Sequence, residues 1–173
     1  NQTLDVTAAG TYSVTVTNGS CSANSTIDVT VNSFPVVNLG NDTTICAGST
    51  LTLDAGNAGA SFLWNDNSTN QTLDVTAAGT YSVTVTNGNC SANDTIEVTI
   101  NQFPVVNLGA DTAICAGVTL TLDAGNAGAS YLWNDNSTNQ TLDVTAAGTY
   151  FVTASNGACS TNDTIEVTIN PSP

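Results

Sequence analysis

The segment NQTLDVTAAGTY occurs three times in this chain, beginning at Asn1, Asn70 and Asn139, at a constant spacing of 69 residues. Residues 32–100 and 101–169 are identical at 59 of 69 positions. Self-similarity at a fixed period is the signature of an array of like modules. An active site needs one set of different residues brought together, whereas an array of modules carries the same residues in every module. The repeat therefore favours a structural role, in which the modules extend and connect, over a catalytic role.

The chain contains no Lys, Arg or His and 14 acidic residues, so its formal net charge is −14. Such a polyanion repels phosphate backbones and anionic lipid surfaces, which excludes nucleic-acid binding. No apolar run approaches the roughly 18–20 residues of a membrane span, so we expect no direct membrane insertion. Modules of this size bury a limited fraction of their surface and usually need a covalent staple, which the five cysteines can provide.

Apolar and polar residues alternate with period two in each repeat, as in TYSVTVT (80–86) and DTIEVTI (94–100). This pattern, rich in Thr and Val, is typical of half-buried strands. Loops rich in Gly, Asn and Asp separate the strands and tolerate tight turns. Roughly six short strands per repeat predict an antiparallel β-sandwich. The fold class that we expect is all-β, with tandem sandwich modules forming an elongated rod.

The linkers between repeats are the segments NSFPVVNLG (32–40) and NQFPVVNLG (101–109). Pro35 and Pro104 fix φ and cannot donate a ladder hydrogen bond, so each suits a sheet edge or a stiff hinge. The preceding phenylalanines are candidates to pack at the junction. These linkers are short and contain one glycine each, so we expect them to be semi-rigid rather than flexible tethers.

The repeat register predicts four parts of the chain. Residues 1–33 are the C-terminal half of a sandwich, residues 34–102 and 103–170 are complete sandwiches, and residues 171–173 begin the next linker. Because residue 1 falls in the middle of a repeat, we expect the chain to be an internal piece of a longer polypeptide.

The run ICAGSTLTLDAG…SFLWNDNSTNQTLDVTAAGTYSVTVTNGNCSANDTIEVTI resembles the PKD-like and immunoglobulin-like (Ig-like) repeats of large adhesins and gliding-associated proteins. Bacteria export those proteins through the type IX secretion system. The matching features are the strand with Trp64, the GTYSVTV strand, one cysteine before the second strand and one after the GTYSVTV strand. The resemblance implies sandwich modules at the bacterial cell surface, in an extracellular protein.

The five cysteines follow the repeat, because Cys46 and Cys90 are 44 residues apart, as are Cys115 and Cys159. One pair per module, 46–90 and 115–159, leaves Cys21 to a partner outside the fragment. Closing such a loop is worth about 4 kcal/mol and indicates an oxidising compartment. In a simple sandwich, however, the two cysteines of one module can lie at opposite ends. A link between neighbouring modules, Cys46–Cys159, is then the alternative.

The composition lacks most of the side chains that enzymes use for catalysis. Without His or Lys, a general base must be a carboxylate, and the hydroxyl groups lack a conventional activator. Carboxylate pairs such as Asp66 and Asp74 recur in the next repeat, where turn or surface roles explain them. We therefore expect no enzymatic activity and no cofactor.

Calcium is a weaker expectation, since Asp residues fall in loops beside Asn residues and free carbonyls, which are hard-cation ligands. No loop has a regular calcium-binding spacing, and solvated turns are the competing interpretation. The candidate ligands are Asp42, Asp54, Asp66, Asp111, Asp123 and Asp135.

The aromatic residues allow two interpretations. Trp64, Trp133, Tyr81 and Tyr150 can stack on sugars, but in this kind of sandwich a Trp and a Tyr at these positions are usually core and corner residues. We therefore expect the aromatic side chains to pack inside the modules.

Four Asp-Thr tripeptides are similar to the O-glycosylation acceptor of the same bacterial group. The resemblance makes the threonines candidate glycosylation sites, and the strand pattern predicts that two of them, Thr95 and Thr164, lie on an outward face. The four candidates are Thr43, Thr95, Thr112 and Thr164.

These observations favour a structural role, the stalk or filament of a giant secreted adhesin that extends a binding or motility element from the cell. The expected partners are neighbouring repeats, by lateral association into a filament, and glycans. A carbohydrate- or calcium-binding module that acts by avidity is the first alternative. A spacer in a secreted enzyme is the second.

Overall fold

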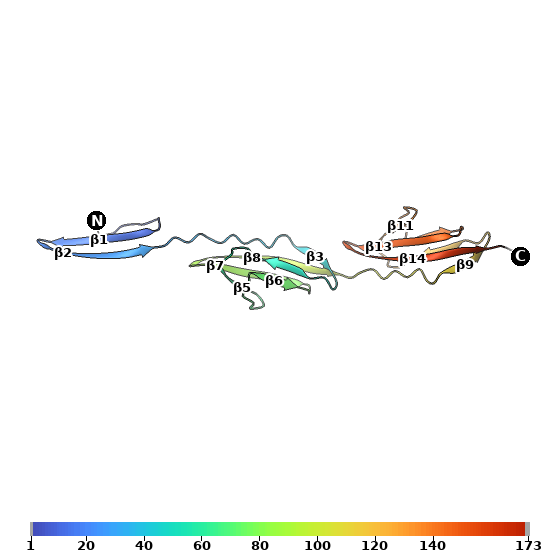
Figure 1. Ribbon diagram of the computed structural model, residues 1–173, viewed down its shortest axis with the longest axis horizontal. Helices are drawn as coiled ribbons and strands as arrows, with labels where there is room; N and C mark the ends of the chain where they lie inside the picture. Colours follow the sequence, from blue (N-terminus) through green and yellow to red (C-terminus); the bar gives the residue numbers. More distant parts are fainter. Residues whose placement is uncertain (1, 172–173) are drawn as a thin grey trace. The chain divides into compact units, whose positions relative to one another are not determined.

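The computed structural model describes residues 2–171, which form the strands β1–β14 and no helix (Figure 1). The expected all-β fold is therefore confirmed. The predicted linker start at 171–173 lies mostly outside the described residues. The chain divides into two compact units: the residues up to Leu39, Asp54–Thr72 and Ser82–Thr95 form unit 1, and Gly40–Leu53, Leu73–Tyr81 and the residues from Ile96 onward form unit 2.

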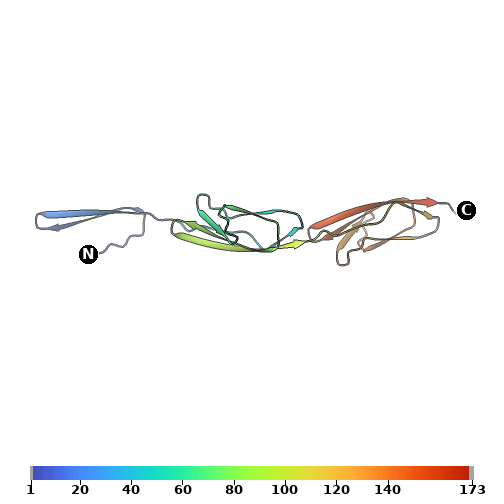
Figure 2. The ribbon, with the colours of Figure 1, turned by 90° about the horizontal axis from the view of Figure 1, so that it is seen from below.

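The third repeat is a complete sandwich within unit 2 (Figures 1 and 2). One sheet has the strand order β11-β13-β14-β9, and the other pairs β10 with β12. Its strands are β9 (Thr112–Cys115), β10 (Leu120–Asp123), β11 (Ser130–Trp133), β12 (Thr141–Val144), β13 (Gly148–Asn156) and β14 (Cys159–Asn170).

The core of this sandwich lies between its two sheets. Trp133 is 1% exposed and packs with inward residues of both sheets, as period-two alternation requires. The outward positions on β10, β12 and β14 carry polar residues, which stay in contact with water. Two outward positions are apolar: Leu132 on β11 is 52% exposed and Phe151 on β13 is 46% exposed. The buried cluster is Leu122, Ala124, Trp133, Val144, Val152, Ile165 and Val167.

The second repeat has the same strands in the same order. A four-stranded sheet is ordered β3-β8-β7-β5, and a second sheet pairs β4 with β6. The inward residues at equivalent positions, including Trp64, Val83 and Ile96, are also buried. The strands are β3 (Thr43–Cys46), β4 (Leu51–Asp54), β5 (Ser61–Trp64), β6 (Thr72–Val75), β7 (Gly79–Asn87) and β8 (Cys90–Asn101).

One strand of each sandwich departs from the antiparallel expectation. β3 runs parallel to the last residues of β8, with Cys46 opposite Asn101. β9 runs parallel to the last residues of β14, with Cys115 opposite Asn170. The first strand of each sandwich thus ends beside the end of the last strand, and this register fixes where the first cysteine of each repeat lies.

The segment before the second repeat forms a single hairpin, with β1 (Gly10–Asn18) antiparallel to β2 (Cys21–Val29). Its apolar residues match core positions of the other repeats. Val14 is 58% exposed, whereas the equivalent Val152 is fully buried. The difference arises because β1 and β2 pair only with each other among the described strands.

Candidate functional site

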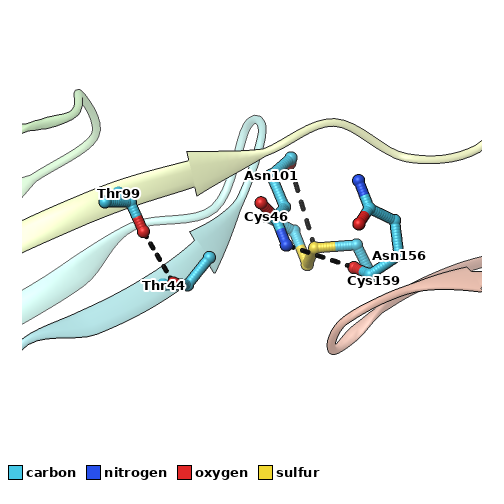
Figure 3. The surroundings of a disulfide bond; sticks show 6 residues. All are labelled: Thr44, Cys46, Thr99, Asn101, Asn156 and Cys159. Carbon is cyan, nitrogen blue, oxygen red and sulfur yellow. Dashed lines mark hydrogen bonds between the residues drawn. A yellow bond between two sulfur atoms is a disulfide. The ribbon is translucent and has the colours of Figure 1, made fainter. Parts of the chain in front are cut away.

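The chemical feature that stands out is a disulfide bond between Cys46 of the second repeat and Cys159 of the third (Figure 3). The two cysteines are 113 residues apart in sequence, and their Cα atoms are 5.6 Å apart. That separation is normal for a disulfide. Both residues belong to unit 2. We call the groups around this bond the joint: the plug, Asn156–Cys159, and the socket, which consists of Cys46 and Asn101.

The plug is the tip of the β13–β14 hairpin. Asn156 pairs with Cys159, so only Gly157 and Ala158 form the turn. Gly157 has φ of 61°, and positive φ at the first of two turn residues is the arrangement of a type II′ turn, in which glycine is favoured. The sequence thus builds a narrow, uncharged tip with a cysteine at its base.

The socket is the end of the parallel pair β3–β8. Cys46 is the last residue of β3, and the N–H of the next residue, Ala47, donates to the carbonyl oxygen of Asn101 at 2.8 Å. The Thr44 and Thr99 hydroxyl groups, two residues earlier on each strand, are hydrogen-bonded to each other at 2.6 Å (Figure 3). These bonds hold Cys46 beside the end of β8.

Asn101 contacts the plug directly. Its Nδ2 donates to the carbonyl oxygen of Asn156 at 3.3 Å (Figure 3). Cys159 Sγ lies 3.8 Å from the Asn101 carbonyl oxygen, a contact rather than a hydrogen bond because a disulfide sulfur carries no hydrogen. A Cβ added at Gly157 would lie 3.0 Å from Asn101 Nδ2, so a larger residue here would require the Asn101 side chain to shift.

The predicted pairings Cys46–Cys90 and Cys115–Cys159 are wrong. Cys46 is bonded to Cys159, while Cys90 and Cys115 are free thiols, as is Cys21. The reason is the parallel register, because Cys115 lies opposite the last residue of β14 and Cys159 is its first residue. A strand of 12 residues separates its ends by roughly 36 Å, far beyond a disulfide's reach. The alternative link between neighbouring repeats is the one that the structure contains.

The linker after the socket is anchored to the third repeat. Asn126, with φ of 55°, accepts a hydrogen bond from Val105 N–H at 2.9 Å and donates one to the Val105 carbonyl at 2.8 Å. Leu108 N–H donates to Asp163 at 2.7 Å. Pro104 is buried, whereas Phe103 is 45% exposed, so proline and not phenylalanine packs here. The linker is therefore held to the third repeat by specific hydrogen bonds, and its predicted stiffness stays a prediction.

Sequence reasoning missed the asparagines and the glycine of the joint. The motif Asn-Gly-x-Cys lies at the start of the last strand in every repeat, and its Asn and Gly residues by themselves predict only a turn. Asn101, at the end of β8, carried no signal of its own, since Asn is common throughout the chain. The repetition of both features with the 69-residue period was the available clue.

The candidate calcium ligands serve local turns. Asp123 Oδ1 accepts hydrogen bonds from Gln140 Nε2 at 2.9 Å and Gly125 N–H at 2.8 Å. The Gln140 side chain, followed by the Gly125 N–H, lowers the pKa of Asp123, and burial opposes this weakly. Asp54 has the same arrangement with Gln71 and Gly56, and its pKa is lowered for the same reasons.

The remaining acidic candidates also bind backbone groups. Asp66 and Asp135 accept from N–H groups two residues on, at 2.8 Å in both cases. Asp42 and Asp111 accept from N–H groups of the last strand of their sandwich, at 2.9 Å. Within residues 2–171, no three acidic or cysteine side chains are grouped as a metal site would require. Calcium binding remains an untested prediction.

The candidate glycosylation sites fall into two environments. Thr95 and Thr164 are exposed on β8 and β14, where the strand pattern placed them. Thr43 and Thr112 begin β3 and β9 and are half-buried. A glycan therefore has room at Thr95 and Thr164, and its presence stays a prediction.

The aromatic residues occupy the core and corner positions that we expected. Trp64 and Trp133 are each 1% exposed, so neither can stack on a sugar. Trp133 Nε1 donates to the Asn139 carbonyl at 2.8 Å, which satisfies its one polar group. The Tyr150 hydroxyl donates to the carbonyl of Ala146, four residues upstream, at 2.9 Å, as in the tyrosine corner of Ig-like sandwiches.

Solved structures of tandem domains resemble this chain. Titin domains I67–I69, in an E-to-A variant, match 94% of this chain and 75% of the titin chain, with 16% identity and a TM-score of 0.51. Extracellular domains 3–5 of Drosophila OTK match 94% of this chain and 71% of theirs, with 16% identity and a TM-score of 0.55. The chain is thus a tandem of Ig-like sandwiches in its fold.

No family model and no curated protein matches the chain. In the described part of the chain, no helix is long and apolar enough to cross a membrane.

Proposed function

We propose that the chain is a structural segment, the repeating stalk or filament of a large secreted surface protein. The single observation that carries this proposal is the Cys46–Cys159 disulfide, which joins one sequence repeat covalently to the next. A bond within each repeat would stabilise modules one at a time. A bond between repeats instead resists their separation, which is a mechanical property.

The hydrogen bonds around the joint support the same role. The linker carries bonds from Asn126 and Asp163, so little free chain remains between the socket and the third repeat. A force that pulls the two repeats apart acts first on the disulfide and on short hydrogen-bonded strands. It extends the linker only afterwards. The fold of the titin fragment, a tandem of Ig-like domains, is compatible with this use.

We propose an extracellular location, because disulfides persist in oxidising compartments. The OTK fragment that the chain resembles in fold is also extracellular. The more specific context, a bacterial surface protein exported by the type IX system and used in adhesion or gliding, rests on the sequence resemblance. The domains at 1–33, 34–102 and 103–170 are proposed as the units of the array.

Small-angle scattering on chains with increasing numbers of repeats tests the stalk. The expected result is a maximum dimension that grows linearly with the number of repeats. A dimension that grows only as the cube root of the mass describes a compact globule and would contradict the proposal. The same series with Cys46→Ser and Cys159→Ser separates the role of the disulfide from that of the linker.

Two other roles give different results on the same chain. Saturable binding on a glycan array, or saturable calcium uptake by calorimetry, would favour an adhesive module that acts by avidity. Lateral association of chains, another part of the filament proposal, would appear as concentration-dependent mass in analytical ultracentrifugation under reducing conditions. Flanking catalytic sequence would favour a spacer in a secreted enzyme.

A further inference from the structure

The chain contains three Asn-Gly dipeptides, and each lies at the tip of the hairpin that ends its repeat. An asparagine side chain cyclises most readily onto a following glycine, because glycine has no Cβ to obstruct the approach to its nitrogen. The hairpin tip is therefore a candidate site of spontaneous chemical modification, and in the third repeat it coincides with the plug. The three dipeptides are Asn18-Gly19, Asn87-Gly88 and Asn156-Gly157.

The reaction is deamidation through a cyclic imide. The Gly157 nitrogen loses its proton to solvent and attacks Cγ of Asn156, and the side-chain amide nitrogen takes up a proton and leaves as ammonia. Water then adds to one of the two imide carbonyl carbons and opens the ring. The products are aspartate, or isoaspartate, in which the main chain is longer by one carbon atom. One water is consumed and one ammonia released, and no oxidant or reductant takes part.

The joint holds Asn156 in a conformation that opposes ring closure. Closure needs rotation about the Asn156 Cα–C bond, since a strand keeps the main chain extended and Cγ away from the next nitrogen. Asn156 is the last residue of β13 and pairs with Cys159, which the disulfide ties to Cys46. Asn101 Nδ2 donates to the carbonyl oxygen of Asn156, on the carbon that has to rotate (Figure 3). The intact joint therefore resists the rotation that the reaction requires.

The other two tips are restrained less. Asn87 Nδ2 donates to the Ser33 carbonyl at 3.2 Å, but Cys90 at the base of that tip is a free thiol. Asn18 is exposed, and a Cβ built at Gly19 would meet no atom within 4 Å. The same dipeptide thus occurs in one chain under three degrees of restraint.

From these observations we propose that Asn156-Gly157 is a self-modification site that the joint protects. The Asn156 amide survives while the Cys46–Cys159 bond is intact, and it converts to isoaspartate and aspartate after the bond is reduced. This inference goes beyond the stalk proposal, because it makes the opening of a joint irreversible.

The products do not fit the socket. Isoaspartate lengthens the two-residue turn that positions Cys159, and Cys159 is only 1% exposed, so its seat leaves little room for displacement. Both products also add a carboxylate to a chain whose formal charge is already −14 and which has no Lys, Arg or His to pair with it. A converted plug is therefore expected to return to its socket slowly.

The unaltered chain and the double variant Cys46→Ser/Cys159→Ser test the protection. Both are aged in neutral, oxygen-free buffer without added thiol and then digested with pepsin in acid, and mass spectrometry measures conversion at each dipeptide. In the unaltered chain, Asn156 is expected to convert about tenfold more slowly than Asn18. In the double variant this difference is expected to disappear, while Asn87, the internal control for general unfolding, keeps its rate.

A single variant tests the hydrogen bond with the disulfide in place. Asn101→Ala removes the donor to the Asn156 carbonyl and leaves all cysteines unchanged. Loss of one hydrogen bond is expected to accelerate conversion of Asn156 about fivefold. Equal conversion of Asn156 in the unaltered chain and the double variant would overturn the protection, as would an acceleration at Asn87 that matches the one at Asn156.

Reoxidation tests the irreversibility. The chain is reduced, aged until Asn156 has converted, and transferred to a glutathione redox buffer beside freshly reduced chain. Strain in the lengthened turn is expected to slow the return of the Cys46–Cys159 bond about tenfold, as measured in non-reduced digests. Converted chain that regains the bond as fast as fresh chain would overturn this part of the proposal. None of these outcomes alters the scattering test, so this proposal and the stalk proposal fail separately.

Discussion

Cys46 lies at the end of one sandwich's first strand and Cys159 at the start of another's last strand, and their Cα atoms are 5.6 Å apart. The bond between them closes a loop of about the size of one and a half repeats. Loops of that length are costly to order, so the bond removes much conformational entropy from the unfolded chain. The joint is therefore a stabilising element as well as a link.

Loss of this disulfide is expected to destabilise unit 2. In the chain-entropy model, closing a loop of this length is worth about 5 kcal/mol. Chemical denaturation of Cys159→Ser, compared with the unaltered chain, measures the change in the midpoint. Cys90→Ser, which removes a free thiol at the equivalent position, is expected to change the midpoint little. A similar loss in both variants would contradict the assignment of the stability to the bond.

The disulfide is also expected to reduce the contour length of the chain that an applied force can extend. Pulling on the two ends carries force through the Cys46–Cys159 bond and bypasses the 113-residue interval between them. Reduction releases this interval, which adds about 400 Å of contour length at roughly 3.5 Å per residue. Single-molecule force spectroscopy with and without reductant measures the difference. A contour length that reductant leaves unchanged would show that the bond is absent from the force path.

Gly157→Ala is expected to weaken the plug. The residue has φ of 61°, and an added Cβ would lie 3.0 Å from Asn101 Nδ2. Strain in the turn and displacement of Asn101 together are expected to cost about 1–2 kcal/mol and to slow formation of the disulfide. Gly148→Ala is the matched control, since a Cβ there meets only ordinary contacts with the Tyr150 ring. Thermal unfolding and the rate of oxidative refolding are the two measurements.

Acid is expected to destabilise the turns around Asp54 and Asp123. The pKa of each carboxyl is lowered, mainly by a glutamine side chain and then by a glycine N–H. A lowered pKa in the folded state stabilises the fold above the ordinary value of 3.8, and this contribution disappears as the pH falls through the lowered pKa. Asp123→Asn is expected to flatten the decline of melting temperature as the pH falls below about 4. A decline identical to that of the unaltered chain would show that this carboxyl contributes nothing.

Much of the fold follows from local patterns. The alternation in DTIEVTI and the positions of Trp64 and Tyr81 predicted strands, core and corner, because these depend on nearby residues. The parallel pairing of β3 was not predictable in this way. The segment Thr43–Cys46 is four residues long and its partner on β8 is some 55 residues away, so nothing local distinguishes parallel from antiparallel register.

The disulfide depended on that one undetected register. The spacing of 44 residues between Cys46 and Cys90, which recurs in the next repeat, favours a bond within the repeat. Spacing in sequence, however, does not show at which end of a sandwich each cysteine lies. Once Cys46 is placed opposite Asn101, the hairpin tip of the next repeat is the group that reaches it.

The linked cysteines also determine what happens when the backbone is cut. A protease that hydrolyses any one peptide bond between Cys46 and Cys159 leaves both resulting fragments attached through the two sulfur atoms. Most of the second and third repeats lies in that interval, including the exposed loops that proteases attack first. The molecule can thus be nicked without being severed for as long as the disulfide stays oxidised.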